Sequence, residues 1–223
     1  MIIKNKGSRD SSMELQDDDR LDDVIDKNKV QRTAKIERTT HETLINVGVN
    51  IDGSGQTLVK TGLPFIDHLV SSFGKHSMLD INLKAKSQDG IVHHLIEDAA
   101  IALSLAIDKA LADRLRITRF GYSLVPMDEC LSYAAIDLIK RQFHNIQLKL
   151  TRDIIEDVSR EDLEHFVLSL VQNLNACTHI MVQYGDNDHH KVESAIKAFA
   201  VALRMAVSVD KTRVEIPSTK GAI

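Results

Sequence analysis

Hydrophobic and polar residues follow two different periods along this chain. Between Glu42 and Ile51, the residues Ile45, Val47 and Val49 alternate with polar or small residues and lead into the turn sequence DGSG. This pattern predicts a half-buried strand that ends in a turn. Four further segments have the character of strands: 79–86, 132–139, 143–150 and 179–184. Apolar residues recur at helical spacing in four others: 62–75, 93–112, 160–175 and 189–207.

The second half of the chain repeats the first. Two histidines and a glutamate recur at the same spacing, 96 residues apart: His93, His94 and Glu97, then His189, His190 and Glu193. The apolar positions after each set also match, at offsets that trace the buried stripe of a helix. A shift of 97 residues brings DHLVSSF onto EHFVLSL, and so His68 onto His165. We expect two copies of one strand-and-helix unit, packed about a pseudo-twofold axis.

The repeated histidines are candidate metal ligands. Side chains four residues apart share a helix face, so His189 converges with Glu193, whereas the adjacent side chains of His189 and His190 diverge by about 100°. One ion cannot easily take both neighbours, but two ions could each take one. The eight candidate ligands are His68, His93, His94, Glu97, His165, His189, His190 and Glu193. Imidazole with carboxylate suits Mn, Fe, Zn or Ni, and the lack of thiolate ligands argues against a structural zinc site.

Composition narrows the classes of partner. The net charge is −4, and the 28 Lys and Arg residues form no basic stripe, so we expect no nucleic acid partner. We find no apolar stretch of about 18 residues and no secretory signal, and we expect a cytoplasmic protein with no membrane contact. Cys130 and Cys177 have no CxxC partner and are expected to be reduced thiols. Residues 1–30 are rich in Asp and are expected to form an acidic, disordered extension.

The motifs around the candidate ligands resemble the imidazoleglycerol-phosphate dehydratase family. The resemblance runs from about Arg32 to Ile223 and rests on several segments in the family's order: RTTHET (38–43), TGLPFIDHL (61–69), HHLIEDAAIAL (93–103), RFGYSLVPMDECL (119–131), GDNDHHKVESAIKAFAVALR (185–204) and PSTKG (217–221). It implies an α+β fold with two tandem copies of a four-stranded sheet backed by two helices, a duplicated ribosomal S5 domain 2-like unit. The halves then cover 31–122 and 123–223, the second ending in a phosphate-binding tail.

The resemblance also implies an activity. A hydro-lyase of histidine biosynthesis would remove water from D-erythro-imidazoleglycerol phosphate to give imidazole acetol phosphate. The family's enzymes use two divalent ions per active site, with Mn²⁺ expected. They assemble as homo-oligomers of 24 subunits with sites shared between subunits.

Motif matching assigns further site residues. The candidate catalytic residues are Glu42 as an acid/base group, Glu193 as both ligand and proton-transfer group, and Asp128 near the substrate. The candidate substrate-binding residues are Glu42 and, for the phosphate, Arg119, Arg141, Lys197, Ser218 and Lys220. Lys197 also lies four residues after Glu193, so an ion pair on the helix surface is its rival interpretation.

The chain departs from the family's usual pattern in three places. KRQF at 140–143 stands where Gly-Arg-Pro-Tyr is usual, Ser72 replaces a common glutamine, and the loop before His93 is one residue shorter. Two other functions therefore stay open at this point: a metal-binding or metal-storage assembly that has lost catalysis, and a two-metal hydrolase. Substrate turnover separates all three.

Overall fold

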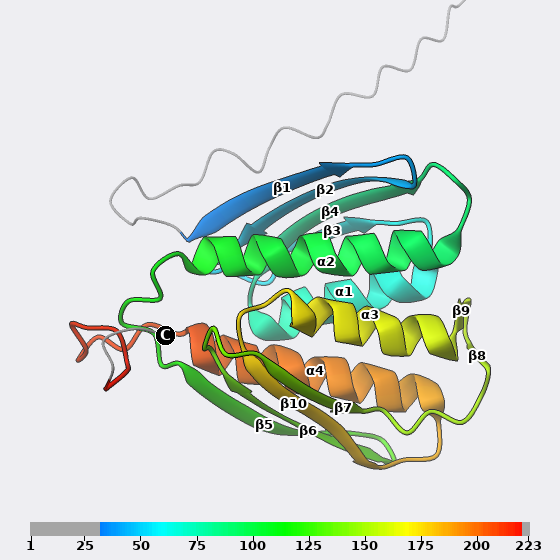
Figure 1. Cartoon of the computed structure of the whole chain (residues 1–223). Coiled ribbons are helices and arrows are strands. Elements are labelled where there is room, and N and C mark those ends of the chain that lie inside the picture. Colours follow the sequence, from blue (N-terminus) through cyan, green and yellow to red (C-terminus); the bar gives the residue numbers. More distant parts are fainter. Residues whose placement is uncertain (1–31, 220–223) are drawn as a thin grey trace, which may run out of the picture. The chain divides into compact units, whose positions relative to one another are not determined.

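The computed structural model describes residues 32–219, which form two similar halves (Figure 1). The first half contains β1 (Thr33–Thr39), β2 (Thr43–Asn50), β3 (Thr57–Lys60), α1 (Pro64–Ser77), β4 (Asp80–Ser87) and α2 (Val92–Leu111). The second contains β5 (Phe120–Met127), β6 (Cys130–Asp137), β7 (Phe143–Gln147), β8 (Ile154–Ile155), β9 (Val158–Ser159), α3 (Arg160–Gln172), β10 (Cys177–Tyr184) and α4 (Asp188–Val207). The predicted extension, residues 1–30, and the candidate Lys220 lie outside the described residues.

Each half has a four-stranded sheet with the same strand order. The orders are β1-β2-β4-β3 and β5-β6-β10-β7. In both sheets the last pair is parallel and the other pairs are antiparallel. This correspondence confirms the duplicated α+β unit. The segment 112–119 joins the halves, and the boundary drawn from the sequence, at 122/123, falls inside β5.

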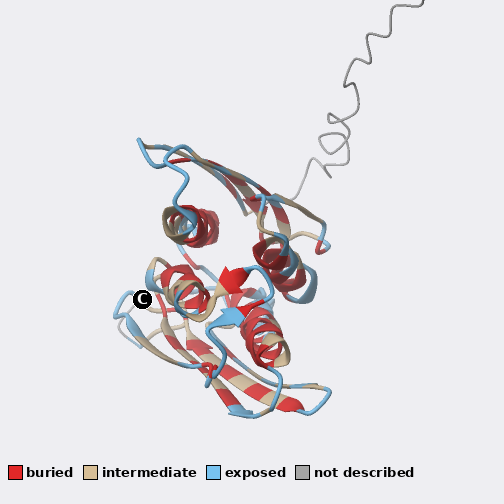
Figure 2. Cartoon of the chain, turned by 90° about the vertical axis from the view of Figure 1, so that its right-hand side faces the viewer, coloured by how far each residue is buried: buried red, intermediate tan, exposed pale blue. Residues whose placement is uncertain are grey.

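The helices of the two halves pack against each other between the two sheets (Figure 1). Helix α1 contacts α4, and α2 contacts α3. Phe73 of α1 stacks on Phe199 of α4 with ring centroids 5.5 Å apart, and both side chains are buried. Buried residues follow the helices and the inner faces of both sheets (Figure 2). The halves therefore share one continuous core.

Side chains from loops fix where two of the helices begin. The side chain of Asn187 accepts a hydrogen bond from the His189 N–H at 2.9 Å and so caps α4. Helix α1 begins at Pro64, a favoured first residue. The Phe65 N–H of α1 donates to the carboxylate of Asp157 at 3.0 Å, although Asp157 belongs to the β8–β9 turn of the other half. The contact with Asp157 therefore ties the start of α1 to the second half.

All nine elements predicted from the sequence are present, with ends displaced by at most three residues. The pattern does not predict β1, β3, β5, β8 or β9. In β5 the alternation is inverted, because Phe120, Tyr122 and Leu124 are exposed while Gly121 faces α4. A Cβ atom at position 121 would lie 1.9 Å from the carbonyl oxygen of Ala202, so the close packing of α4 on β5 requires glycine there.

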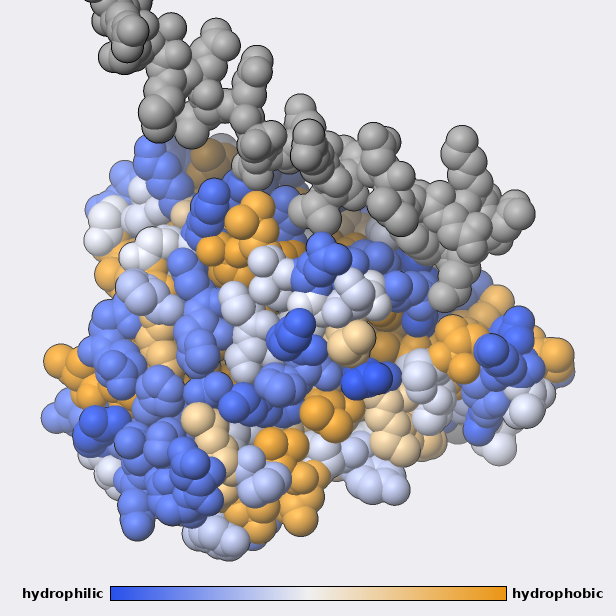
Figure 3. All heavy atoms as spheres, turned by 180° about the vertical axis from the view of Figure 1, so that it is seen from behind, coloured by the Kyte–Doolittle hydropathy of each residue, from blue (hydrophilic) through white to orange (hydrophobic). Residues whose placement is uncertain are grey.

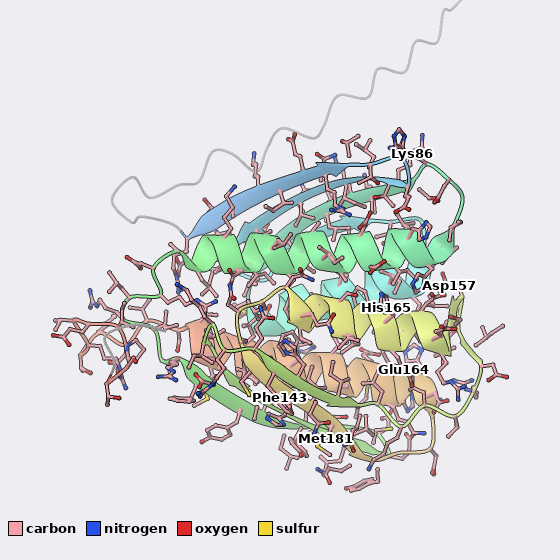
Figure 4. The ribbon with its side chains drawn as sticks, in the orientation of Figure 1. Lys86, Phe143, Asp157, Glu164, His165 and Met181 are labelled. Carbon is pink, nitrogen blue, oxygen red and sulfur yellow. The ribbon has the colours of Figure 1, made fainter. Side chains whose placement is uncertain are left out.

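The outer faces of the two sheets differ in character. The first sheet exposes mainly polar and charged side chains: Lys35, Glu37, Asn46, Asn82 and Lys86. The second sheet exposes large apolar ones, which we call the apolar sheet face: Phe120, Tyr122, Leu124 and Phe143. Figure 4 labels Lys86 on the first sheet and Phe143 with Met181 on the second. The view from behind shows apolar patches set between polar side chains (Figure 3).

Two further properties concern the described chain as a whole. Within residues 32–219, no helix is long and apolar enough to cross a lipid bilayer. Cys130 and Cys177 are both free thiols, as expected from their spacing. Burial raises the pKa of the Cys130 thiol to about 11, and the neighbouring Glu129 adds to that effect.

Candidate active site

Six of the eight predicted ligands form two clusters. The first, which we call the His189 cluster, contains His68 of α1 with His189 and Glu193 of α4. The Nε2 atoms of His68 and His189 lie 3.1 and 3.2 Å from the same carboxylate oxygen of Glu193. A cavity of about 470 Å³ opens beside these three side chains. The convergence of His189 with Glu193 follows from their spacing of four residues on one helix.

The second group, the His93 cluster, contains His93 and Glu97 of α2 with His165 of α3. The rings of His93 and His165 are stacked with centroids 4.7 Å apart. The Nε2 atom of His165 lies 3.2 Å from a carboxylate oxygen of Glu97. That nitrogen is buried, and its contact with Glu97 lacks the geometry of a hydrogen bond, so among residues 32–219 it has only this carboxylate contact. Figure 4 labels His165 at the end of the molecule that carries β8 and β9.

Each cluster takes one helix from each half of the chain. The His189 cluster joins α1 to α4, and the His93 cluster joins α2 to α3. The donor set of two imidazoles and one carboxylate, held within 4.8 Å, fits a divalent transition ion. The buried nitrogen of His165, which makes no hydrogen bond within residues 32–219, supports the same interpretation.

The remaining two predicted ligands point elsewhere. His94 faces the turn between β1 and β2, where its Nδ1 lies 3.9 Å from the carboxylate of Glu42. His190 faces the equivalent turn between β5 and β6, and its Nε2 lies 3.6 Å from the carboxylate of Asp128. The rings of His189 and His190 are nearly perpendicular, at 89°. His189 and His190 therefore have different partners, and two of the predicted catalytic carboxylates lie beside His94 and His190.

The carboxylate of Glu193 is buried but is surrounded by hydrogen-bond donors. Burial favours a raised pKa for this carboxyl, but hydrogen bonds from Lys197 and His68 outweigh burial and lower the pKa to about 2. The ammonium of Lys197 lies 2.9 Å from the Glu193 carboxylate, so the ion pair named as its rival role is formed. Glu193 is consequently held in the ionised form that binds cations.

The other candidate phosphate residues gather at the far end of α4. The Arg119 N–H donates to the Ala206 carbonyl at 2.9 Å, near the last residue of α4, whereas His189 lies near its first. At about 1.5 Å per residue, the helix separates them by about 25 Å. Arg119 and residues 212–219, including Ser218, line a second cavity of about 570 Å³. Arg141 is exposed in the loop after β6, whose last residue pairs with Phe120 of β5.

Arg119 is already engaged within the chain. Its guanidinium forms two hydrogen bonds to Asp137, at 2.6 and 3.0 Å, and a third to the Pro217 carbonyl at 2.8 Å. Arg119 therefore holds the C-terminal segment in place. Within one chain, Arg119, Arg141 and Ser218 therefore lie far from the His189 cluster. Lys197 is the only one of the described phosphate candidates that lies beside it.

Four carboxylates that contact the repeated histidines were not predicted as site residues from the sequence. They are Asp89, Glu129, Glu156 and Asp162. Glu129 follows Asp128 directly in the PMDE motif, which was the available signal. The other three lie in loops or at a helix start, where acidic residues are common for local reasons.

Known proteins resemble this chain over most of its length. Residues 61–203 match the family model described as imidazoleglycerol-phosphate dehydratase. The imidazoleglycerol-phosphate dehydratase of Prosthecochloris aestuarii is 41% identical over 197 residues, covering 88% of this chain and 98% of the relative. That of Zymomonas mobilis is 42% identical over 196 residues, covering 87% of this chain and 100% of the relative.

Solved structures agree with these relatives. The imidazoleglycerol-phosphate dehydratase of Staphylococcus aureus superposes with a TM-score of 0.72 at 28% identity, covering 79% of this chain and 99% of its own. The enzyme of Pyrococcus furiosus also gives 0.72, at 32% identity, covering 84% of this chain and 100% of its own. The chain therefore belongs to the imidazoleglycerol-phosphate dehydratase family, whose members are metal-dependent hydro-lyases of histidine biosynthesis.

Proposed function

We propose that this chain removes water from D-erythro-imidazoleglycerol phosphate to give imidazole acetol phosphate, with two Mn²⁺ ions at each active site. The observation that carries the proposal is the pair of clusters, each with two imidazoles and one carboxylate. Imidazole with carboxylate, without thiolate, is compatible with Mn, Fe, Zn or Ni, and the choice of Mn²⁺ among these follows the family resemblance. When bound, the ions supply Lewis acidity that stabilises negative charge on the imidazole ring of the substrate.

The protein's own carboxylates move the protons in this proposal. Glu193 is held ionised by Lys197 and His68 and serves first as a ligand. Glu42 is half exposed beside His94, so its carboxyl can reach a bound substrate and act as the acid/base group. Asp128 lies beside His190 in the corresponding turn of the other half and is assigned to the substrate's surroundings.

His94 and His190 are assigned to the clusters of neighbouring subunits. Each cluster has three ligands from one chain, while these two histidines lie at the same helix ends beside other carboxylates. A histidine from a second copy would add a fourth ligand to each cluster, and the substrate would bind beside it. The active sites in this proposal are incomplete without another subunit.

The phosphate-binding residues also serve a neighbouring copy. A small substrate cannot bridge the distance of about 25 Å between Arg119 and His189 along α4. Arg119, Arg141, Ser218 and Lys220 are therefore assigned to the substrate bound at the clusters of another subunit. Lys197 is assigned to the substrate at its own chain's His189 cluster, which it already contacts through Glu193.

The apolar sheet face supplies a surface for assembly. Phe120, Tyr122, Leu124 and Phe143 are each more than half exposed in the single chain. Large apolar patches of this kind mark contact surfaces between proteins. We assign this face to contacts between copies in a homo-oligomer of 24 subunits, the number that the family resemblance implies.

Two assignments concern the chain's organisation and location. We assign residues 31–122 and 123–223 to the two catalytic halves and residues 1–30 to an extension that catalysis does not need. Deletion of residues 1–30 is expected to leave turnover and particle size unchanged, and loss of either contradicts this assignment. A cytoplasmic location agrees with the two free thiols, because reducing compartments keep cysteines unpaired.

The decisive experiment measures turnover by metal-stripped protein with and without added Mn²⁺. We expect ketone product only with Mn²⁺, and a decrease of about 100-fold to 10,000-fold in the Glu42→Gln variant, the range for loss of a general acid or base. Glu37→Gln, an exposed glutamate on the first sheet, is the matched control. Metal binding without any product would indicate a metal-storage relative, and phosphate release without ketone would indicate a hydrolase.

A further inference from the structure

Each of the four repeated histidines has a carboxylate at its Nδ1 atom. The distances are 2.6 Å from His93 to Asp162 and 3.1 Å from His189 to Glu156. They are 2.6 Å from His94 to Asp89 and 2.8 Å from His190 to Glu129. All four contacts have the geometry of hydrogen bonds, and all four partners lie outside the two clusters of candidate ligands.

These contacts determine which ring nitrogen carries hydrogen. An ionised carboxylate can only accept a hydrogen bond, so Nδ1 of each ring must be the donor. In a neutral imidazole the Nε2 atom then keeps its lone pair. In His189 the Nε2 atom lies 3.2 Å from the carboxylate of Glu193, with the geometry of a hydrogen bond. A metal ion in the cluster would take the place of a proton on this nitrogen, while Nδ1 keeps its hydrogen bond to Glu156.

The duplication of the chain explains only part of this set. Glu129 lies in the β5–β6 turn, and the equivalent β1–β2 turn carries Glu42, whose carboxylate lies 3.9 Å from Nδ1 of His94. Glu156 and Asp162, in contrast, have no acidic counterpart in the first half at a shift of 96 or 97. The contacts of these two carboxylates are therefore not a consequence of the repeat.

One short segment serves both clusters at once. Glu156 and Asp157 lie in the turn between β8 and β9, and Asp162 lies in the first turn of α3, just after β9. Glu156 contacts His189, and Asp157 caps α1, the helix that carries His68. Asp162 contacts His93 of the other cluster. The segment 156–162 thus touches three of the four helices that carry ligands; Figure 4 labels Asp157 within it.

We propose that Asp89, Glu129, Glu156 and Asp162 are positioning residues that fix the Nδ1–H tautomer and the ring orientation of the four repeated histidines for metal binding. This inference rests on the proposed metal centres. Hydrogen bonds from ligand histidines to carboxylates raise ligand basicity as well as fixing the ring, and their loss costs about 10-fold to 100-fold in metal affinity.

Local roles are a rival explanation for three of the four. Asp162 also accepts from the Ser159 hydroxyl at 2.7 Å and so supports the start of α3. Asp89 also accepts from the Ile91 N–H, and Glu129 also accepts from the Asn187 N–H, so both stabilise the chain before a helix. Glu156 is different, because His189 is the only hydrogen-bonding partner of its side chain among residues 32–219. Its carboxylate is also half exposed, so its substitution does not threaten the fold. Glu156 therefore gives the cleanest test.

The test uses the full-length protein stripped of metal. Mn²⁺ is titrated into the parent and into Glu156→Gln and Asp162→Asn, and the unbound ion is measured by its EPR signal. Glu161→Gln is the matched control, because it removes the same charge from an exposed side chain next to Asp162. We expect each of the first two variants to weaken one class of site by about 10-fold to 100-fold and to leave the other class unchanged. The control should match the parent.

A second readout separates positioning from a merely structural role. In Cu²⁺-loaded protein, pulsed EPR detects the remote imidazole nitrogen, whose quadrupole coupling depends on the hydrogen bond that it makes. That coupling should change in Glu156→Gln and Asp162→Asn but not in Glu161→Gln. Unchanged affinity and unchanged coupling in both variants overturn the inference while leaving the metal centres in place. A parent protein that binds no Mn²⁺ overturns the inference and the metal centres together.

Discussion

Replacement of Lys191 by methionine should destabilise the protein far more than loss of an exposed ion pair. The ammonium of Lys191 lies 2.8 Å from the Asp188 carboxylate, and the two side chains are only 6% and 1% exposed. The same carboxylate accepts hydrogen bonds from the Thr151 and Arg152 N–H groups. The Lys191→Met substitution removes the nearest cation from this buried carboxylate and leaves only the half-exposed Arg152 at 3.9 Å, so the loss should approach the cost of about 3–5 kcal/mol for a broken buried pair.

The pKa of Asp188 gives a second estimate of how strongly Lys191 stabilises the buried carboxylate. Burial favours a raised pKa, but Lys191 and the two N–H groups together lower it from 3.8 to about 2. At about 1.4 kcal/mol per unit, this difference of nearly two units corresponds to about 2 kcal/mol. Because the folded pKa is lowered, this stability is complete above about pH 4 and is lost as the pH falls towards 2. The Lys191→Met variant should lose much of that dependence.

The assay is urea unfolding at pH 7, followed by circular dichroism of metal-free protein at one subunit concentration. A fixed concentration is needed because assembly contributes to apparent stability. The control is Arg213→Met, which breaks an ion pair of the same sequence spacing with Asp210, but at 46% and 32% exposure. Exposed pairs contribute at most about 1 kcal/mol, so this variant should unfold almost like the parent.

A rescue variant tests whether the unpaired charge causes the loss of stability. Adding Asp188→Asn to Lys191→Met removes the uncompensated charge and should restore part of the lost stability. A Lys191→Met protein that unfolds within about 1 kcal/mol of the parent would show that the pair is not needed. A double variant no more stable than the single one would show that charge was not the cause.

Three further outcomes follow from packing, surface and burial. Gly121→Ala should lower the free energy of unfolding in urea by about 1–3 kcal/mol, because the added Cβ collides with α4. In the control Gly48→Ala the added Cβ has its nearest neighbour at 3.9 Å, so the free energy of unfolding should change little. Equal effects of the two substitutions would contradict the clash. Tyr122→Lys should lower the particle mass measured by light scattering, whereas the control Asn46→Lys on the first sheet should not. An unchanged mass for Tyr122→Lys would count against the apolar sheet face as an interface. Cys130, with its pKa raised to about 11, should resist iodoacetamide at pH 8 until the protein is unfolded, and rapid labelling of native protein by mass spectrometry would disagree.

The sequence predicted best those features that follow from local helical geometry and from the spacing of apolar residues. Apolar spacing located all four helices of the described chain, because each buries a wide stripe against a sheet and another helix. The spacing of His189 and Glu193 predicted their convergence, since helical geometry alone determines it. The duplication also predicted the common strand order, although β1, β3 and β5 were missed as separate elements.

Other features depend on contacts that no local pattern encodes. Strand β5 directs Phe120 and Tyr122 outward, so its apolar alternation identifies the wrong face as buried unless α4 is already in place. The carboxylates of Glu156 and Asp162 reach histidines 33 and 69 residues away in the chain. The separation of Arg119 from His189 became visible only when the structure placed them beside opposite ends of α4. Motif matching had put them in one site, and it could not assign them to different subunits.

Because each cluster takes one helix from each half, neither half alone contains a complete set of three ligands. Two separate polypeptides of this kind would have to meet in solution before either could bind an ion with full affinity, and dilution would empty the sites. The linker 112–119 turns that bimolecular encounter into an intramolecular one, with an effective concentration of about millimolar for a short connection. Covalent fusion of the two halves thus removes one concentration-dependent step from the filling of the ligand clusters and leaves only the assembly of whole subunits.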